Sequence, residues 1–155
     1  MSTLTTTVIH RRVAALRAGE DPTLLARFAS GWAVLGDPQV IPGYCLLLPD
    51  PVVPHLNALE GAARGAFLAD MAALGDVLLA ECGALRINYA IFGNVEPALH
   101  AHLFPRRADE AAERATAQPW AWDWTQSPPF AVTLHGALRD RLRGAIAAAR
   151  TGERF

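Results

Sequence analysis

Residues 93 to 106 read Gly-Asn-Val-Glu-Pro-Ala-Leu-His-Ala-His-Leu-Phe-Pro-Arg. A Gly-Asn pair, typical of a turn, precedes a segment in which apolar residues flank and separate His100 and His102. Because alternate side chains of a strand point to the same face, both imidazoles should lie on one side of a sheet. The His-x-His spacing fits a metal site, another chemical site, or two half-exposed strand histidines.

Three further strands are predicted around this one. Residues 85–92 alternate apolar and polar side chains and lead into the 93–97 loop, which predicts an antiparallel hairpin. Upstream, residues 27–35 read as a strand, and residues 44–48 form a short apolar strand that Pro49 ends. A Gly-Asp-Pro-Gln turn joins these two, so they are expected to pair with each other.

Helices are expected at both ends of the chain and between the strand pairs. Residues 5–18 and 57–81 carry apolar side chains at helical spacing, and Asn57 with Glu60 resembles a capping pair for the second helix. Residues 108–117 are expected to form a short helix, and apolar residues spaced between Leu134 and Ile146 predict a C-terminal one.

Strands and helices do not alternate strictly, which favours an α+β fold with an antiparallel sheet, one long helix and additional N- and C-terminal helices. The length of 155 residues predicts a single domain, residues 1–155. Its core is expected at about 27–106, preceded by the N-terminal helix and followed by a Trp-rich segment and the last helix.

Composition narrows the function classes. The chain is 52% hydrophobic and 19% charged, which allows a sizeable core, and its net charge of −1 argues against nucleic acid as a partner. All 14 basic residues are Arg, which excludes lysine Schiff-base chemistry and a Walker-type phosphate loop. The first residues lack a signal-peptide pattern, and no apolar run reaches the roughly 18 residues of a membrane helix. We therefore expect a cytoplasmic protein without membrane contact.

Three of the four tryptophans, Trp120, Trp122 and Trp124, fall within five residues. Such rings can cover the sheet, form a contact between subunits, or close over a nucleobase. The sequence leaves these interpretations open.

Residues 88–106 resemble the active-site hairpin of the histidine triad (HIT) family, whose motif His-φ-His-φ-His-φ-φ is often followed by Pro-Arg. Pro105-Arg106 sets the register, in which His102 matches the third histidine and His100 the second. The first position is Ala98, so the chain departs from the family there.

Residues 37–49, Asp-Pro-Gln-Val-Ile-Pro-Gly-Tyr-Cys-Leu-Leu-Leu-Pro, are similar to a second stretch of the family. That stretch has an acidic or amide residue, then Pro-Gly-His, then an apolar strand ending in Pro, and Tyr44 stands where His is common. The resemblance covers roughly residues 27–106. It implies a HIT-like fold and is strongest toward the bacterial branch similar to diadenosine tetraphosphate hydrolases.

The resemblance implies a hydrolase or nucleotidyl transferase that acts at the α-phosphate of a dinucleoside polyphosphate or nucleoside phosphoramidate, through a nucleotidyl-histidine intermediate. His100 is then the nucleophile, since a neutral imidazole has a free lone pair at neutral pH. His102 supports the phosphate or orients His100, and Asn94 bonds the phosphate or the leaving group. The resemblance implies no cofactor and no metal, and it implies a homodimer.

Three further residues complete the expected site as substrate-binding groups. Asp37 is the candidate partner of the ribose hydroxyls, although an Asp before Pro is equally typical of a turn. Asn88 sets the hairpin or reaches the phosphate, and Arg106 offers a bidentate phosphate contact.

Two alternatives remain open at this stage. A metal-dependent hydrolase could use His100 and His102 as ligands, but catalytic zinc normally takes three protein ligands. The third would have to come from afar, from His55, His135 or Glu96. Alternatively, Ala98 is compatible with a nucleotide-binding or sensor protein of the same fold that has little turnover.

Overall fold

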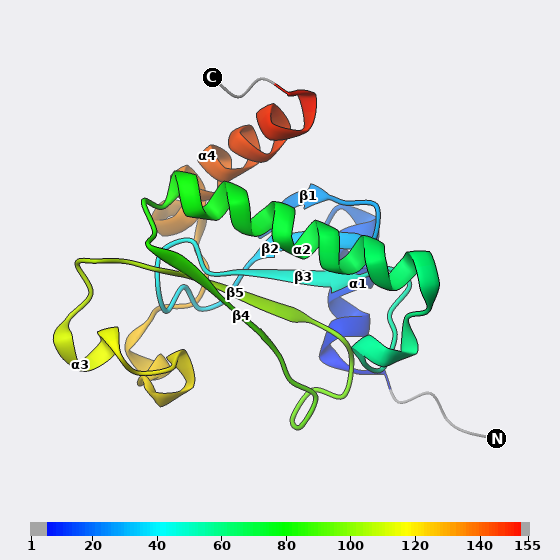
Figure 1. Ribbon diagram of the computed structural model, residues 1–155, viewed down its shortest axis with the longest axis horizontal. Coiled ribbons are helices and arrows are strands. Elements are labelled where there is room, and N and C mark those ends of the chain that lie inside the picture. Colours follow the sequence, from blue (N-terminus) through cyan, green and yellow to red (C-terminus); the bar gives the residue numbers. More distant parts are fainter. Residues whose placement is uncertain (1–5, 153–155) are drawn as a thin grey trace.

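Five antiparallel strands form one sheet in the order β1-β2-β3-β5-β4, as the computed structural model in Figure 1 shows. The structure describes residues 6–152. The strands are β1 (Leu24–Arg27), β2 (Gly31–Leu35), β3 (Cys45–Pro49), β4 (Arg86–Ile91) and β5 (Ala101–Arg106). The helices are α1 (Val8–Ala18), α2 (Gly61–Glu81), α3 (Ala112–Ala115) and α4 (Val132–Thr151). The expected α+β fold with an antiparallel sheet is confirmed.

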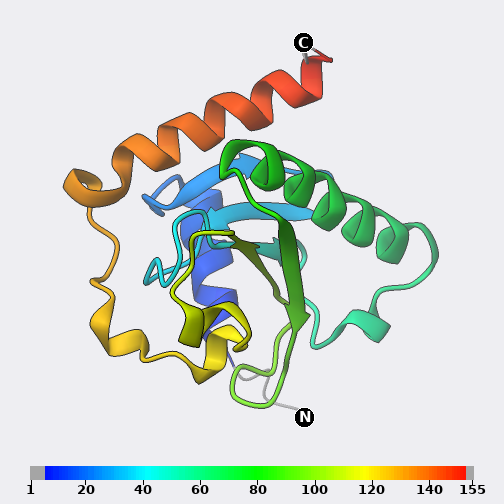
Figure 2. The same cartoon turned by 60° about the vertical axis from the view of Figure 1, so that its left-hand side comes forward.

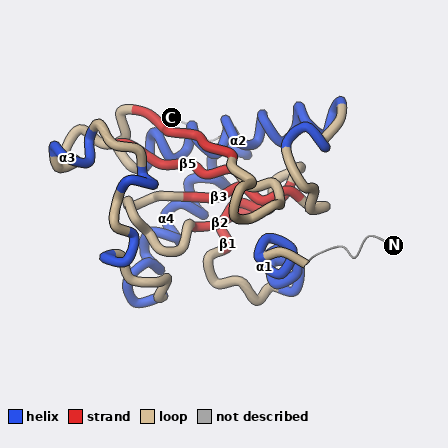
Figure 3. The backbone as a smooth tube through the Cα atoms, turned by 90° about the horizontal axis from the view of Figure 1, so that it is seen from below, coloured by secondary structure: helices blue, strands red, loops and turns tan. Residues whose placement is uncertain are grey.

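Alternation along the strands divides the core into two layers. On one face of the sheet, Leu47 and Leu103 pack with Phe67 and Leu78 of α2, and α4 lies against the same layer (Figure 2). We call this the helical face. Figure 3 shows α1 on the opposite side of the sheet from α2 and α4. The residues of this second layer come from α1, β2, β3 and β5 and include Ile9, Val13, Val34, Leu46 and Phe104.

The second face also carries His100 and His102, and we call it the histidine face. Its polar residues sit where α1 leaves the sheet uncovered. The segment from Pro119 to Gln126, two short 3-10 turns with the tryptophans, packs over this part instead. His102 lies on this face through the strand alternation of β5, and His100, just before the strand, lines the same pocket.

The first predicted strand is divided. Residues 27–35 contain the end of β1, a tight turn at residues 28–30 and then β2. The turn closes because Phe28 and Gly31 exchange backbone hydrogen bonds of 2.8 and 3.3 Å. Gly31 lies so close to the backbone of Leu48 that a Cβ atom could not be accommodated. The expected β2–β3 pairing is confirmed, with Trp32 opposite Leu48.

Helix boundaries differ from the predicted ones at four places. The long helix begins at Gly61 rather than Asn57, because residues 56–58 form a separate 3-10 turn; Arg64 donates 2.7 and 3.3 Å hydrogen bonds to the carbonyls of Leu59 and Asn57. α3 is only four residues long, and α4 begins two residues before Leu134. The first helix begins at Val8, capped by Thr7, while residue 5 lies outside the described residues.

Candidate active site

His100 precedes β5 and is 8% exposed. Its Nδ1 lies 2.7 Å from the backbone carbonyl oxygen of Ala98. A carbonyl can only accept, so Nδ1 carries the proton and Nε2 keeps its lone pair. The backbone thereby selects the tautomer in which the outer nitrogen is a nucleophile.

His102 has the opposite tautomer, because its Nδ1 accepts a hydrogen bond. Its Nδ1 lies 2.8 Å from the hydroxyl of Tyr44, the residue just before β3. Burial and the neighbouring His100 lower the pKa of His102 to about 4, and burial raises the pKa of Tyr44 above its ordinary value. The phenol therefore keeps its proton and donates it to Nδ1, which leaves His102 neutral with a proton on Nε2. The two imidazoles, 4.8 Å apart between centroids, thus present one acceptor and one donor.

Aromatic rings enclose this pair. Tyr44 stacks on Phe104 at 4.3 Å and an interplanar angle of 5°. Trp120 stands perpendicular to His102 at 5.0 Å and to Phe92 at 4.7 Å. Gly36 lies against the ring of Tyr44, with no room for a Cβ atom. These contacts exclude water from one side of His102 and account for its lowered pKa.

A pocket of about 490 Å³ opens in front of the histidines. It is lined by both imidazoles, by the loop that follows β4 and by Trp120: Phe92, Asn94, Val95, Glu96, His100, His102 and Trp120. The structure therefore brings together the three residues predicted to be catalytic, His100, His102 and Asn94. We call this space the histidine pocket.

Glu96 anchors the pocket loop to α1. Its carboxylate oxygens accept hydrogen bonds from the backbone N–H groups of Val8 and Ile9, at 3.2 and 3.3 Å. These are orphan donors of the first helical turn, where negative charge is favoured by the helix dipole. The loop is thus positioned from across the chain, 87 and 88 residues away.

The chain resembles known proteins at the level of its fold. No protein-family model and no curated protein matches the chain. Among solved structures, a histidine triad protein from Marinobacter aquaeolei VT8 superposes with a TM-score of 0.72 at 19% identity, covering 91% of this chain and 96% of that one. The chain has the histidine triad fold.

Two more structures agree with this. A histidine triad protein from Bradyrhizobium japonicum gives a TM-score of 0.68 at 22% identity, over 84% of this chain and 94% of that one. A hypothetical histidine triad nucleotide-binding protein from Sulfolobus tokodaii strain 7 gives 0.68 at 12% identity, over 87% and 90%. At these identities the likeness shows the fold, and the site must be argued from this chain's own residues.

Arg106 is not free to meet a ligand in this version of the histidine triad fold. It is 7% exposed, and all five of its N–H donors are engaged. Nε and Nη2 bond Glu110 at 2.9 and 2.7 Å, and Nη1 bonds the Asn88 side-chain oxygen at 2.9 Å. The remaining donors reach the carbonyls of Arg114 and Ala117 at 2.8 and 3.0 Å. Arg106 thus organises the segment after β5 and fixes the amide of Asn88.

Asp37 lies away from the histidine pocket. One of its carboxylate oxygens accepts a 2.8 Å hydrogen bond from the backbone N–H of Phe130, just before α4. The structure therefore ties the turn after β2 to the start of the C-terminal helix through this carboxylate. Gly36, the residue before Asp37, has no side chain and cannot take the ribose-binding role expected of Asp37.

Ala98 is 1% exposed and packs in the core layer of the histidine face. The first position of the motif is thus filled by apolar packing, while its backbone oxygen still orients His100. The sequence does not predict the roles of two other residues at the site. Tyr44 is evident there only as a departure from the motif, and Phe92 only as the end of a predicted strand. A contact between residues 58 positions apart leaves no periodic signal.

The described residues contain neither a cluster of metal-ligand side chains nor a helix that could span a membrane. Between residues 6 and 152, no three His, Cys, Asp or Glu side chains come together in a way that could hold a metal ion. His55 and His135 do not line the histidine pocket, whereas Glu96 does and is bonded to α1. Among helices in the same range, none is long and apolar enough to cross a membrane.

Proposed function

We propose that this chain belongs to the histidine triad family and hydrolyses a nucleoside phosphate derivative at its α-phosphorus. The observation that carries the proposal is the hydrogen bond from His100 Nδ1 to the Ala98 carbonyl, which leaves Nε2 as a nucleophile inside a 490 Å³ pocket. The substrate class is a dinucleoside polyphosphate, whose leaving group is a phosphate chain, or a nucleoside phosphoramidate, whose nitrogen takes a proton from the solvent and leaves as a neutral amine. The fold likeness and the hairpin motif support the same assignment.

The reaction divides into two displacements. In the first, the lone pair of His100 Nε2 forms a P–N bond, and the bond from phosphorus to the leaving group breaks with its electron pair going to the leaving group. The resulting imidazolium is stabilised by the Ala98 carbonyl, which accepts from Nδ1–H. In the second, water attacks phosphorus and loses a proton to the solvent, the P–N bond breaks with its electron pair returning to His100 Nε2, and the nucleoside monophosphate is released.

His102 and Asn94 serve the phosphate. With its proton on Nε2, His102 donates a hydrogen bond to a non-bridging oxygen and does not compete as a nucleophile. Asn94 lies in the same pocket and can donate to a second oxygen or to the leaving group. This arrangement stabilises the extra negative charge of the transition state with neutral donors.

The test is a hydrolysis screen of purified protein over diadenosine tetraphosphate and adenosine 5′-phosphoramidate, with and without chelator. We expect metal-independent turnover that His100→Ala abolishes while the circular dichroism spectrum is unchanged. His102→Ala should slow turnover without abolishing it. Turnover that survives His100→Ala but not His102→Ala would refute the roles. Activity lost on chelation and regained with zinc would favour the metal-dependent alternative, and nucleotide binding without turnover would favour the sensor alternative.

We further propose that the protein is a homodimer. β4 is a sheet edge, and within residues 6–152 it pairs only with β5. Leu85 is 62% exposed and Tyr89 45% exposed along this edge. A second copy pairing β4 with β4 would satisfy the backbone groups of this edge and cover Leu85. Light scattering at micromolar concentration checks this: an unchanging mass near 16.6 kDa would rule the dimer out.

A further inference from the structure

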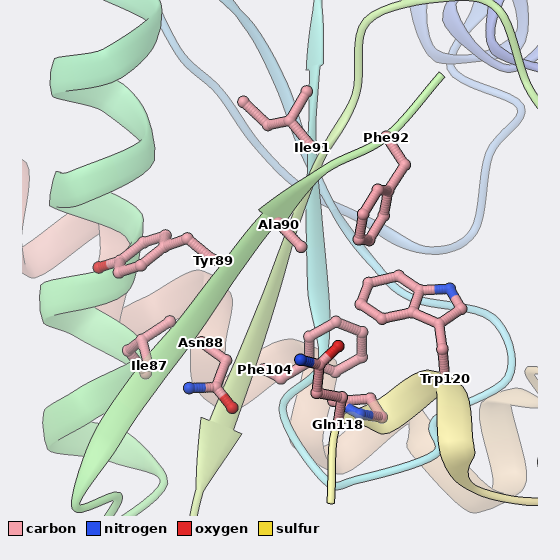
Figure 4. A pocket seen from close by; sticks show the side chains of 10 residues that line it. Ile87, Asn88, Tyr89, Ala90, Ile91, Phe92, Phe104, Gln118 and Trp120 are labelled. Carbon is pink, nitrogen blue, oxygen red and sulfur yellow. The ribbon is translucent and has the colours of Figure 1, made fainter. Parts of the chain in front are cut away.

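A second pocket opens beside the histidine pocket, around β4 (Figure 4). Its volume is about 530 Å³, and Phe92 and Trp120 line both spaces. Neither histidine lines it. Its lining comes from β4, from Phe104 and from the segment at residues 118–120: Ile87, Asn88, Tyr89, Ala90, Ile91, Phe92, Phe104, Gln118, Pro119 and Trp120. We call it the side pocket.

The side pocket contains one small side chain, Ala90. Ala90 lies directly opposite His102 in the β4–β5 register and is among the residues that line the pocket, so a larger side chain at this position would reduce its volume. Three aromatic rings also line the pocket, with Trp120 perpendicular to Phe92 at 4.7 Å and to Phe104 at 5.2 Å. Walls of this kind accept a flat aromatic ring, by stacking or by edge contact.

Two side-chain amides give the side pocket a polar edge. The oxygen of Asn88 is committed to Arg106, so Asn88 can offer a ligand only N–H donors. Figure 4 shows the amide end of Gln118 beside Trp120 in the same space, and an amide can both donate and accept. A ring with hydrogen-bonding atoms on its edge matches this lining better than a plain hydrocarbon does.

We propose that the side pocket binds the group that leaves the phosphorus, and that this group carries a flat ring with polar edge atoms. This inference rests on the proposed function. The half of the substrate that becomes bonded to His100 has to stay in the pocket that contains His100. The departing half needs a neighbouring space without the nucleophile, and the side pocket, which shares Trp120 and Phe92 with the histidine pocket, supplies it. The ring can be the base of a second nucleoside or part of an aromatic amine.

The experiment compares leaving groups. Adenosine 5′-phosphoramidate releases ammonia, the adenosine 5′-phosphoramidate of tryptamine releases an aromatic amine, and diadenosine tetraphosphate releases a second nucleotide. Ala90→Leu fills the side pocket, and Ala90→Ser is the matched control that keeps it open. Because a filled pocket prevents the ring from stacking on the aromatic side chains, we expect Ala90→Leu to lower kcat/KM about tenfold or more for a ring-bearing leaving group.

The same variant should change kcat/KM for the ammonia-releasing substrate less than about twofold, because that substrate leaves the side pocket empty. Which of the two ring-bearing substrates loses more tells whether the amine or the second nucleoside is the natural occupant. Equal losses on all three substrates, or no loss on any, would overturn the proposal. Gln118→Ala, which removes an amide without adding bulk, should show the same selectivity in smaller measure.

A binding measurement separates this inference from the proposed function. If the wild type hydrolyses none of the three substrates, the proposed function fails, but tryptamine and adenosine can still be titrated while the side-chain amide signals of Gln118 and Asn88 are followed by NMR. Saturable shifts that Ala90→Leu weakens about tenfold and Ala90→Ser preserves support a ring-binding pocket. Absence of shifts with both probes would refute it.

Discussion

Acidification should destabilise this protein through His102 in a defined pH window. The pKa of His102 is about 4 in the folded protein and near 6.5 in an unfolded chain. Between these values the unfolded state binds the proton and the folded state does not, so the free energy of unfolding falls as the pH falls from 6.5 to 4. The difference of about 2.5 units corresponds to roughly 3 kcal/mol in total.

Most of this loss occurs before carboxylates interfere. From pH 7 to pH 5, above the ordinary pKa of the carboxylates, the His102 contribution is about 2 kcal/mol. The bond from Arg17 lowers the pKa of Asp50 below its ordinary 3.8, so that this carboxylate titrates beneath the window. His102→Gln, which cannot titrate, should lose markedly less stability over the same interval, although it starts from a lower value because Tyr44 loses its acceptor.

Urea unfolding at half-unit pH steps, on the wild type and His102→Gln, measures the effect. NMR titration of the His102 ring protons should give a midpoint near pH 4. Parallel stability curves for the two proteins, or a midpoint near 6.5, would refute the conclusion that burial and the Tyr44 bond keep His102 neutral.

Three further substitutions test contacts of the site. Tyr44→Phe should cost about 1 kcal/mol of stability and lower kcat more than it raises KM; ring-nitrogen NMR shifts of His102 unchanged from wild type would contradict a tautomer set by this hydroxyl. Gly36→Ala should destabilise by about 1–3 kcal/mol in thermal unfolding, because its methyl group meets the Tyr44 ring, and a wild-type Tm would show that the ring can move away. Arg106→Lys should cost about 3 kcal/mol and leave KM nearly unchanged, while the partly exposed Arg107→Lys is the control; a large rise in KM without loss of stability would instead restore a substrate-binding role.

Local patterns predicted much of this molecule. Strand alternation placed His100 and His102 on one face, and a short hairpin loop brought Asn94 beside them, because these relations span only a few residues. The alternation along residues 27–35 predicts one strand, whereas the structure has a turn at residues 28–30. The close approach of Gly31 to the backbone of Leu48 leaves no periodic signal in the sequence.

Partners distant in the chain could not be predicted in this way. The sequence does not reveal that the segment after β5 folds back to saturate the guanidinium of Arg106. Nor does it reveal that Asp37 meets the backbone of Phe130, 93 residues later. Each of these polar groups finds a partner through the path of a loop, and loop paths have no periodicity.

The hydrogen bonds between Glu96 and the start of α1 affect the electrostatic field in the histidine pocket. The carboxylate more than offsets the roughly half positive charge of the helix terminus, so the pair supplies no positive field toward the pocket. The guanidinium of Arg106 is neutralised by Glu110 in the same way. A polyanionic substrate is thus met by neutral donors and aromatic rings, without electrostatic steering. Its capture should depend only weakly on ionic strength, whereas a pocket built on free cations loses affinity steeply as salt is added.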